Sequence, residues 1–180
     1  MIFVTIGCIK KKDHYLHTTI VITFMIYIGM VITVTLYPLP IQKEEIASLQ
    51  KANFLQNVYV PLSDILHMLK YGGITTILRN IGGNVVLLMP LSILLPFVIK
   101  RHIGIMKMLA IGLLSSISIE STQAIISLII GARYKISSID DVILNTFGAL
   151  IGYLFYALAK RITNNFKIVE STLACRLLNW

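Results

Sequence analysis

The chain has 180 residues, of which 56% are hydrophobic and 13% are charged, and its mean hydropathy is +0.81. Soluble domains contain roughly 45–50% apolar and roughly 25% charged residues, so this composition excludes an ordinary soluble domain and indicates an integral membrane protein. The formal net charge is +8. No soluble basic fold is visible that would present this charge to nucleic acid, so we expect no nucleic-acid partner.

Four apolar segments are long enough to cross a hydrocarbon core of about 30 Å as helices. In chain order they cover residues 18–37, 81–99, 108–130 and 139–159, and the segments outside them include 1–17, 38–80 and 160–180. The predicted fold is all-α, an integral membrane bundle of four transmembrane helices. Because the connection 38–80 is long, we expect it to have structure of its own. Ser63 and Asp64 are suited to cap a short helix that lies along the membrane surface and ends at Gly72 and Gly73.

Basic residues are distributed unevenly between the two sides of this bundle. Segments 1–17, 100–107 and 160–180 hold ten of the sixteen Lys and Arg residues and two acidic residues. The opposite side holds six basic and five acidic residues, counting Asp140 and Asp141 at the start of the fourth span. The positive-inside rule therefore predicts a cell-membrane protein with both termini cytoplasmic and with an extracellular interfacial loop at 38–80. Cys8 and Cys175 then lie on the reducing side, so we expect no disulfide, and these two isolated cysteines predict no metal site. No cofactor is expected.

Polar and small residues recur at helical spacing inside the third and fourth spans. They are Gly112, Ser116, Glu120, Gln123 and Ser127 on the third span, and Asp141, Asn145, Gly148 and Gly152 on the fourth. Spacings of three and four residues place each set on one helix face. Gly148 and Gly152 form a GxxxG pair, which lets two helix backbones approach closely. We therefore expect the third and fourth spans to pack through these faces.

Depth in the membrane distinguishes Glu120 from the other polar residues. At about 1.5 Å per residue it lies about 15 Å below Ile130, near the bilayer midplane, and residues 148–152 reach the same level. A carboxyl group at that depth is costly and marks a functional site by default. With Asp140 and Asp141 at the outer rim, the sequence predicts a polar column that opens outward.

A purely structural interpretation of the other polar residues stands beside this one. Asn84, Gln123 and Asn145 are equally suited to interhelical hydrogen bonds. Asp140 and Asp141 also interact favourably with the dipole at the start of a helix without any ligand.

The order of these polar residues resembles the VanZ-like membrane protein family. The motifs are Arg79-x-x-x-x-Asn84, Pro90 within "NVVLLMPLSILLP", Glu120-x-x-Gln123, and "GARYKISSIDDVILNTFGALIGY". The resemblance covers about residues 57–159. Carried over by position, it implies that the characteristic polar residues are Asn84, Glu120, Gln123, Arg133, Asp140, Asp141 and Asn145. It also implies a Gram-positive cell-membrane protein, in a family whose founding member is associated with resistance to the glycopeptide teicoplanin.

Three classes of function fit these residues. In the first, a noncatalytic protein binds a lipid-linked envelope component or an amphiphilic glycopeptide in the outward column and thereby lowers antibiotic action. In the second, Glu120 or Asp140 acts as acid or base in an enzyme that modifies an envelope lipid; no histidine lies inside a predicted span to assist such chemistry. In the third, Glu120 exchanges protons in a small transporter. We favour the first class; its expected partners are the bilayer and an envelope ligand.

Overall fold

The computed structural model describes residues 2–51, 61–132, 135 and 138–178, and the side chains among them between residues 15 and 163. Within these ranges every regular element is a helix. The elements are α1 (Ile2–Leu36), α2 (Lys43–Lys51), α3 (Ser63–Tyr71), α4 (Ile74–Ile77), the π-helical turn η1 (Leu78–Gly82), α5 (Gly83–Val98), α6 (Ile105–Ile130) and α7 (Ile139–Leu178).

Four helical segments are long and apolar enough to cross a membrane. They are Tyr15–Leu36, Ile74–Val98, Ile105–Ile130 and Ile139–Thr163. The predicted fold class, an all-α membrane bundle of four spanning helices, is therefore confirmed. The second of these segments joins α4, η1 and α5 without a break and so begins before the apolar run at residue 81.

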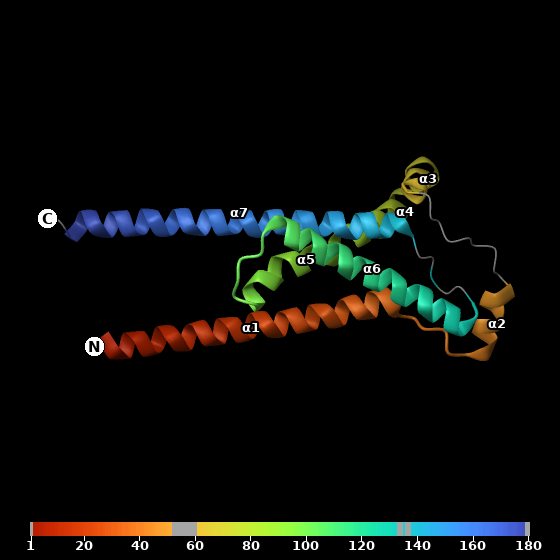
Figure 1. Ribbon diagram of the computed structural model, residues 1–180, viewed down its shortest axis with the longest axis horizontal. Helices are drawn as coiled ribbons and strands as arrows, with labels where there is room; N and C mark the ends of the chain where they lie inside the picture. The colour runs from red at the N-terminus through yellow and green to blue at the C-terminus, as the bar shows by residue number, and fades with distance from the viewer. Residues whose placement is uncertain (1, 52–60, 133–134, 136–137, 179–180) are drawn as a thin grey trace.

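The two ends of the bundle hold different segments of the chain. The N-terminus of α1 and the C-terminus of α7 lie at one end, which we call the terminal end (Figure 1). The helices α2 and α3 lie at the other, which we call the loop end. Near the terminal end, a core cluster of Ile103, Met108, Tyr153 and Tyr156 joins α6 to α7. A second cluster of Leu88, Leu91 and Ala149 joins α5 to α7. Both clusters include α7, so this helix organises the packing.

The two glycines of α7 allow it to lie directly against α5. A Cβ atom on Gly148 would be 1.9 Å from the Val85 carbonyl oxygen, and one on Gly152 would be 2.2 Å from the Met89 carbonyl oxygen. Any side chain at either position would therefore overlap the α5 backbone. The close helix contact predicted at this pair exists, but its partner is the second span and not the third.

The contact between α6 and α7 uses the polar face predicted on the third span. Its buried residues are Met108, Gly112, Ser116, Glu120 and Gln123. A Cβ atom on Gly112 would be 2.6 Å from the Cβ of Ala149. One turn further along, the Asn145 amide donates to the Ser116 hydroxyl at 3.0 Å. The two helices are antiparallel, so the register can be counted from the pair Ser116 and Asn145. Four residues after Ser116 on α6 is Glu120, and four residues before Asn145 on α7 is Asp141, so these two lie level with each other.

This register corrects the predicted depth of Glu120. The prediction placed Ile130 and Ile139 at the same level, which would set Glu120 beside residues 148–152. Instead α6 ends at Ile130, and the positive φ of 68° at Gly131 allows a sharp turn there. The Ser138 amide then donates to the Glu120 carboxylate at 3.2 Å. Glu120 therefore lies level with the start of α7, and α6 continues about 15 Å beyond it.

Candidate binding pocket

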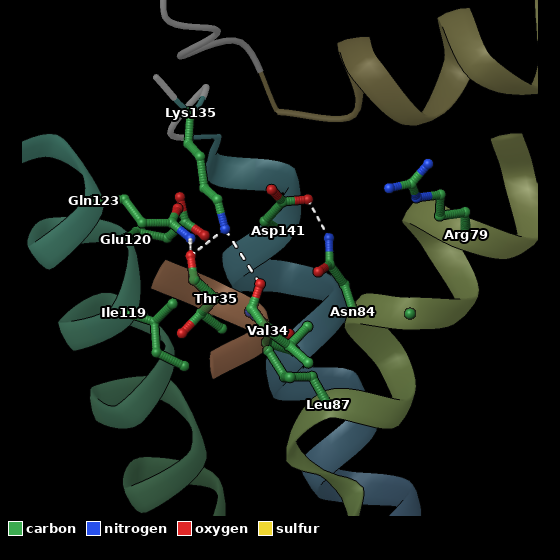
Figure 2. Close-up of a pocket in the computed structure, with 12 residues that line it drawn as sticks. Val34, Thr35, Arg79, Asn84, Leu87, Ile119, Glu120, Gln123, Lys135 and Asp141 are labelled. Carbon is green, nitrogen blue, oxygen red and sulfur yellow. Dashed lines mark hydrogen bonds between the residues drawn. The ribbon is translucent and has the colours of Figure 1, made fainter. Parts of the chain in front are cut away.

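A partly open pocket of about 180 Å³ lies at this level, between α1, α5, α6 and α7. Its lining is mostly polar, with a floor of apolar side chains (Figure 2). The lining residues are Val34, Thr35, Arg79, Gly83, Asn84, Leu87, Ile119, Glu120, Gln123, Lys135, Asp141 and Asn145. All four spanning segments therefore contribute to one site.

Lys135 reaches over the pocket from the loop before α7 and contacts the end of α1. Its ammonium donates to the carbonyl oxygens of Val34, at 3.2 Å, and Thr35. The Val34 carbonyl is available because its usual helical donor would be the amide of residue 38, which is Pro38 and has no N–H. The Gln123 amide also donates to the Thr35 carbonyl, at 2.8 Å. The last turn of α1 is thus held by two side chains from other segments.

The charge of Lys135 is affected by its surroundings. Partial burial lowers the pKa of its ammonium from the ordinary value of 10.5, and the nearby negative charge of Glu120 opposes this change. The lysine therefore balances part of the negative charge in the pocket while its donors stay occupied by carbonyl groups.

A second pair of polar groups joins α5 to the first turn of α7. The Asn84 amide donates to the Asp141 carboxylate. Arg79 lies one turn before Asn84, in the π-helical turn η1, and its exposed guanidinium points toward the pocket (Figure 2). Such turns are frequent at functional sites because they redirect side chains. Within the described part of the chain, the structure gives Arg79 no side-chain hydrogen bond or ion pair.

The inner wall of the pocket carries hydrogen-bond acceptors. The Glu120 side chain is 8% exposed, and the Asn145 side chain is 1% exposed. The amide nitrogen of Asn145 is used by Ser116, but its carbonyl oxygen accepts no hydrogen bond from the residues that the structure describes. A buried acceptor without a partner costs free energy, roughly 1–3 kcal/mol. The wall of this pocket is therefore suited to a ligand that donates hydrogen bonds.

Asp140 has a different environment from its neighbour Asp141. Its carboxylate accepts hydrogen bonds from the backbone amides of Leu62, Asp64, at 2.9 Å, and Ile65, at 3.1 Å. These are donors at the start of α3 that no residue of that helix caps with its side chain. The Ser138 hydroxyl donates to Asp64 at 2.8 Å, which adds a second link. Asp140 therefore fastens α3 to the start of α7, and it does not line the pocket.

The sequence-predicted site residues separate into two groups. Asn84, Glu120, Gln123, Asp141 and Asn145 meet in the pocket, whereas Asp140 lies outside it and Arg133 is outside the described residues. Three further polar lining residues were not among the predicted set: Thr35, Arg79 and Lys135. Arg79 was part of the motif that ends at Asn84. Pro38, which frees a carbonyl group for Lys135, was the available signal for the participation of α1.

Fold and site together define a multi-pass helical membrane protein with a mixed-charge pocket between its spanning helices. A family model described as VanZ/LLP1 matches residues 24–160. The chain belongs to the VanZ/LLP1 family, which confirms the resemblance seen in the sequence motifs. The match begins in the first span, in agreement with the contribution of α1 to the pocket. No curated protein and no solved structure gives a significant match.

Proposed function

We propose that this VanZ-like protein is a noncatalytic membrane protein that binds an envelope lipid, or an amphiphilic glycopeptide itself, in the pocket at the loop end. By holding this ligand it contributes to resistance against glycopeptides such as teicoplanin. With both termini cytoplasmic, as the distribution of basic residues indicates, the loop end faces outward, where such ligands are found.

The observation that carries the proposal is the convergence of polar groups from distant parts of the chain. Residues as far apart as Thr35 and Asn145 line one pocket, which is open enough to admit a ligand and is bordered by spanning helices. Polar residues that only joined the helices would satisfy their hydrogen bonds with one another. Asn145 keeps a buried acceptor unused, and Arg79 points toward the pocket.

Susceptibility to teicoplanin tests this function in a strain in which the intact protein raises resistance. We expect Glu120→Gln and Asp141→Asn to lower resistance to the level of the strain without the protein. Both changes preserve side-chain shape and remove a charge from the pocket. Glu44→Gln is the matched control, because Glu44 is an exposed acid on α2 away from the pocket. Membrane levels of every variant are measured by immunoblot.

The pattern of the results decides the proposal. Loss of resistance in both pocket variants at normal membrane levels, with the control unchanged, supports a functional pocket. Unchanged resistance in both pocket variants contradicts it and leaves these residues a structural role alone. A chemical change in any lipid incubated with the purified protein would replace the binding function by an enzymatic one.

A further inference from the structure

Two carboxylates and two basic groups line the pocket. Arg79 is exposed at its edge, whereas Glu120 and Asn145, with its unused carbonyl oxygen, are buried and Asp141 is half-buried. Lys135 balances only part of the negative charge, because its ammonium is held by the carbonyl oxygens of Val34 and Thr35. A second positive group beside the two carboxylates is therefore favoured. The complementary ligand has a donating cation at its inner end and an anion that reaches Arg79.

A second cavity continues from the first one. This groove, of about 150 Å³, runs between α1 and α6 and is lined by Val31, Ile32, Thr35, Leu36, Ser118, Ile119 and Thr122. Thr35 and Ile119 line both cavities, so the polar pocket and the groove are adjacent. Exposed apolar side chains such as Ile32 border the groove, and they face hydrocarbon when the bundle is in a membrane. An acyl chain is the ligand group that suits this position.

The size of the polar pocket limits the ligand further. Its volume of about 180 Å³ is below the roughly 300 Å³ at the small end of pockets that enclose drug-sized ligands. A small headgroup therefore fits, and a whole glycopeptide does not.

We propose that the ligand is a membrane phospholipid whose headgroup carries a primary amine beyond its phosphate. The ammonium pairs with the carboxylates of Asp141 and Glu120, beside Lys135, and donates to the oxygen of Asn145. The phosphate pairs with Arg79, and one acyl chain occupies the α1–α6 groove. The inference rests on the proposed function and names the class of ligand that the same pocket takes.

Native mass spectrometry of the full-length protein tests this with three phospholipids that have identical chains. Phosphatidylethanolamine carries a primary ammonium, phosphatidylcholine carries a cation without N–H donors, and phosphatidylglycerol carries donors without a cation. We expect the ethanolamine lipid to bind about tenfold more tightly than either of the others, because hydrogen bonds between charged groups are roughly twice as strong as neutral ones. Teicoplanin is measured alongside.

Pocket and groove variants locate the bound lipid. Glu120→Gln and Arg79→Gln each weaken phosphatidylethanolamine binding about tenfold. Arg101→Gln, at an exposed arginine between α5 and α6 that lines neither cavity, leaves it unchanged. Ser118→Phe fills the groove and weakens binding. Ser121→Phe adds the same ring at an exposed position on α6 that lines neither cavity, and it has no effect.

Each alternative result overturns a defined part of the account. Equal binding of the three lipids, lost in Glu120→Gln, overturns the amine-headgroup assignment and leaves the proposed function standing. Binding of teicoplanin but of no phospholipid also overturns the amine-headgroup assignment and leaves the proposed function standing. Lipid binding that no pocket variant alters, together with no binding of teicoplanin, overturns both the ligand class and the proposed function. Unchanged binding in Ser118→Phe overturns the placement of the acyl chain.

Discussion

Replacement of Asp140 by alanine tests the attachment of α3 to the bundle. The Asp140 side chain is 2% exposed, and its carboxylate accepts hydrogen bonds from three backbone amides at the start of α3. Alanine removes all three acceptor contacts and the negative charge near the positive end of the α3 dipole. We expect α3 to separate from the start of α7 while the spanning helices stay packed.

The size of the effect follows from the number of amides that lose a partner. Loss of a single helix cap costs about 1 kcal/mol and up to about 2 kcal/mol. A buried donor that finds no new partner costs roughly 1–3 kcal/mol. Because water reaches some of these amides once α3 moves, we expect local opening of α3 to become easier by about 2–4 kcal/mol. This range corresponds to about 30-fold to several hundredfold faster exchange of the affected amides.

Hydrogen–deuterium exchange of the protein in nanodiscs measures this opening directly. Peptides that contain residues 62–65 are expected to lose protection, while peptides from α5 keep theirs. Asp140→Asn retains one acceptor oxygen and is expected to have an intermediate effect. Glu44→Ala, at an exposed acid in the first turn of α2, is the control. Unchanged exchange at residues 62–65 in Asp140→Ala would refute the anchoring role.

The other predictions concern packing, charge and topology. Gly148→Ala places a methyl group against the Val85 carbonyl and is expected to destabilise the bundle by about 1–3 kcal/mol in thermal unfolding. Gly29→Ala is the control, because a Cβ atom there meets open space. Equal stability of the two variants would contradict the α5–α7 contact. Lys135 is expected to react with an amine-acylating reagent with a pH midpoint below 10.5, because burial lowers its pKa. Glu120→Gln shifts that midpoint lower still, since it removes the charge that favours the ammonium, and a shift upward would contradict the pairing. In a background without Cys8 and Cys175, Lys135→Cys is expected to label with a membrane-impermeant thiol reagent from outside the cell, and Lys100→Cys is not; the reverse pattern would invert the proposed topology.

Helical periodicity predicted the polar face of α6 from the sequence alone. Gly112, Ser116, Glu120 and Gln123 recur at three- and four-residue spacing, and all four are buried. The side chains that meet the facing helix are set by this local repeat, so spacing was sufficient. The number of spanning helices followed from apolar length for the same reason, because a membrane requires a minimum helix length.

Relative positions along the membrane were not available from the same repeat. The level of Glu120 depends on how far α6 continues beyond its contact with α7, and this is visible only in the tertiary contact between Ser138 and Glu120. The ten residues that follow Glu120 carry no charge and continue the helix, so hydropathy gave no sign that α7 begins level with Glu120. The helix that packs against Gly148 is likewise decided by the tertiary fold, since a GxxxG pair permits close contact but does not specify which helix makes it.

The different roles of Asp140 and Asp141 also depend on a distant segment. Their side chains point in different directions from adjacent positions of α7, one toward the start of α3 and the other toward Asn84. The start of α3 is about seventy-five positions away in the chain, and no local pattern near the two aspartates indicates which of them caps it. The sequence therefore predicted both aspartates as parts of one site. In the structure Asp140 holds the start of α3 and Asp141 lines the pocket.

The most direct test of the central claim is the identification of what the pocket holds in cells. Lipids and envelope components that co-purify with the wild-type protein are compared by mass spectrometry with those that co-purify with Glu120→Gln and with the control Glu44→Gln. We expect one enriched component, retained by wild type and control and depleted about tenfold in Glu120→Gln. The same components in the same amounts on all three proteins would contradict a binding function for this pocket.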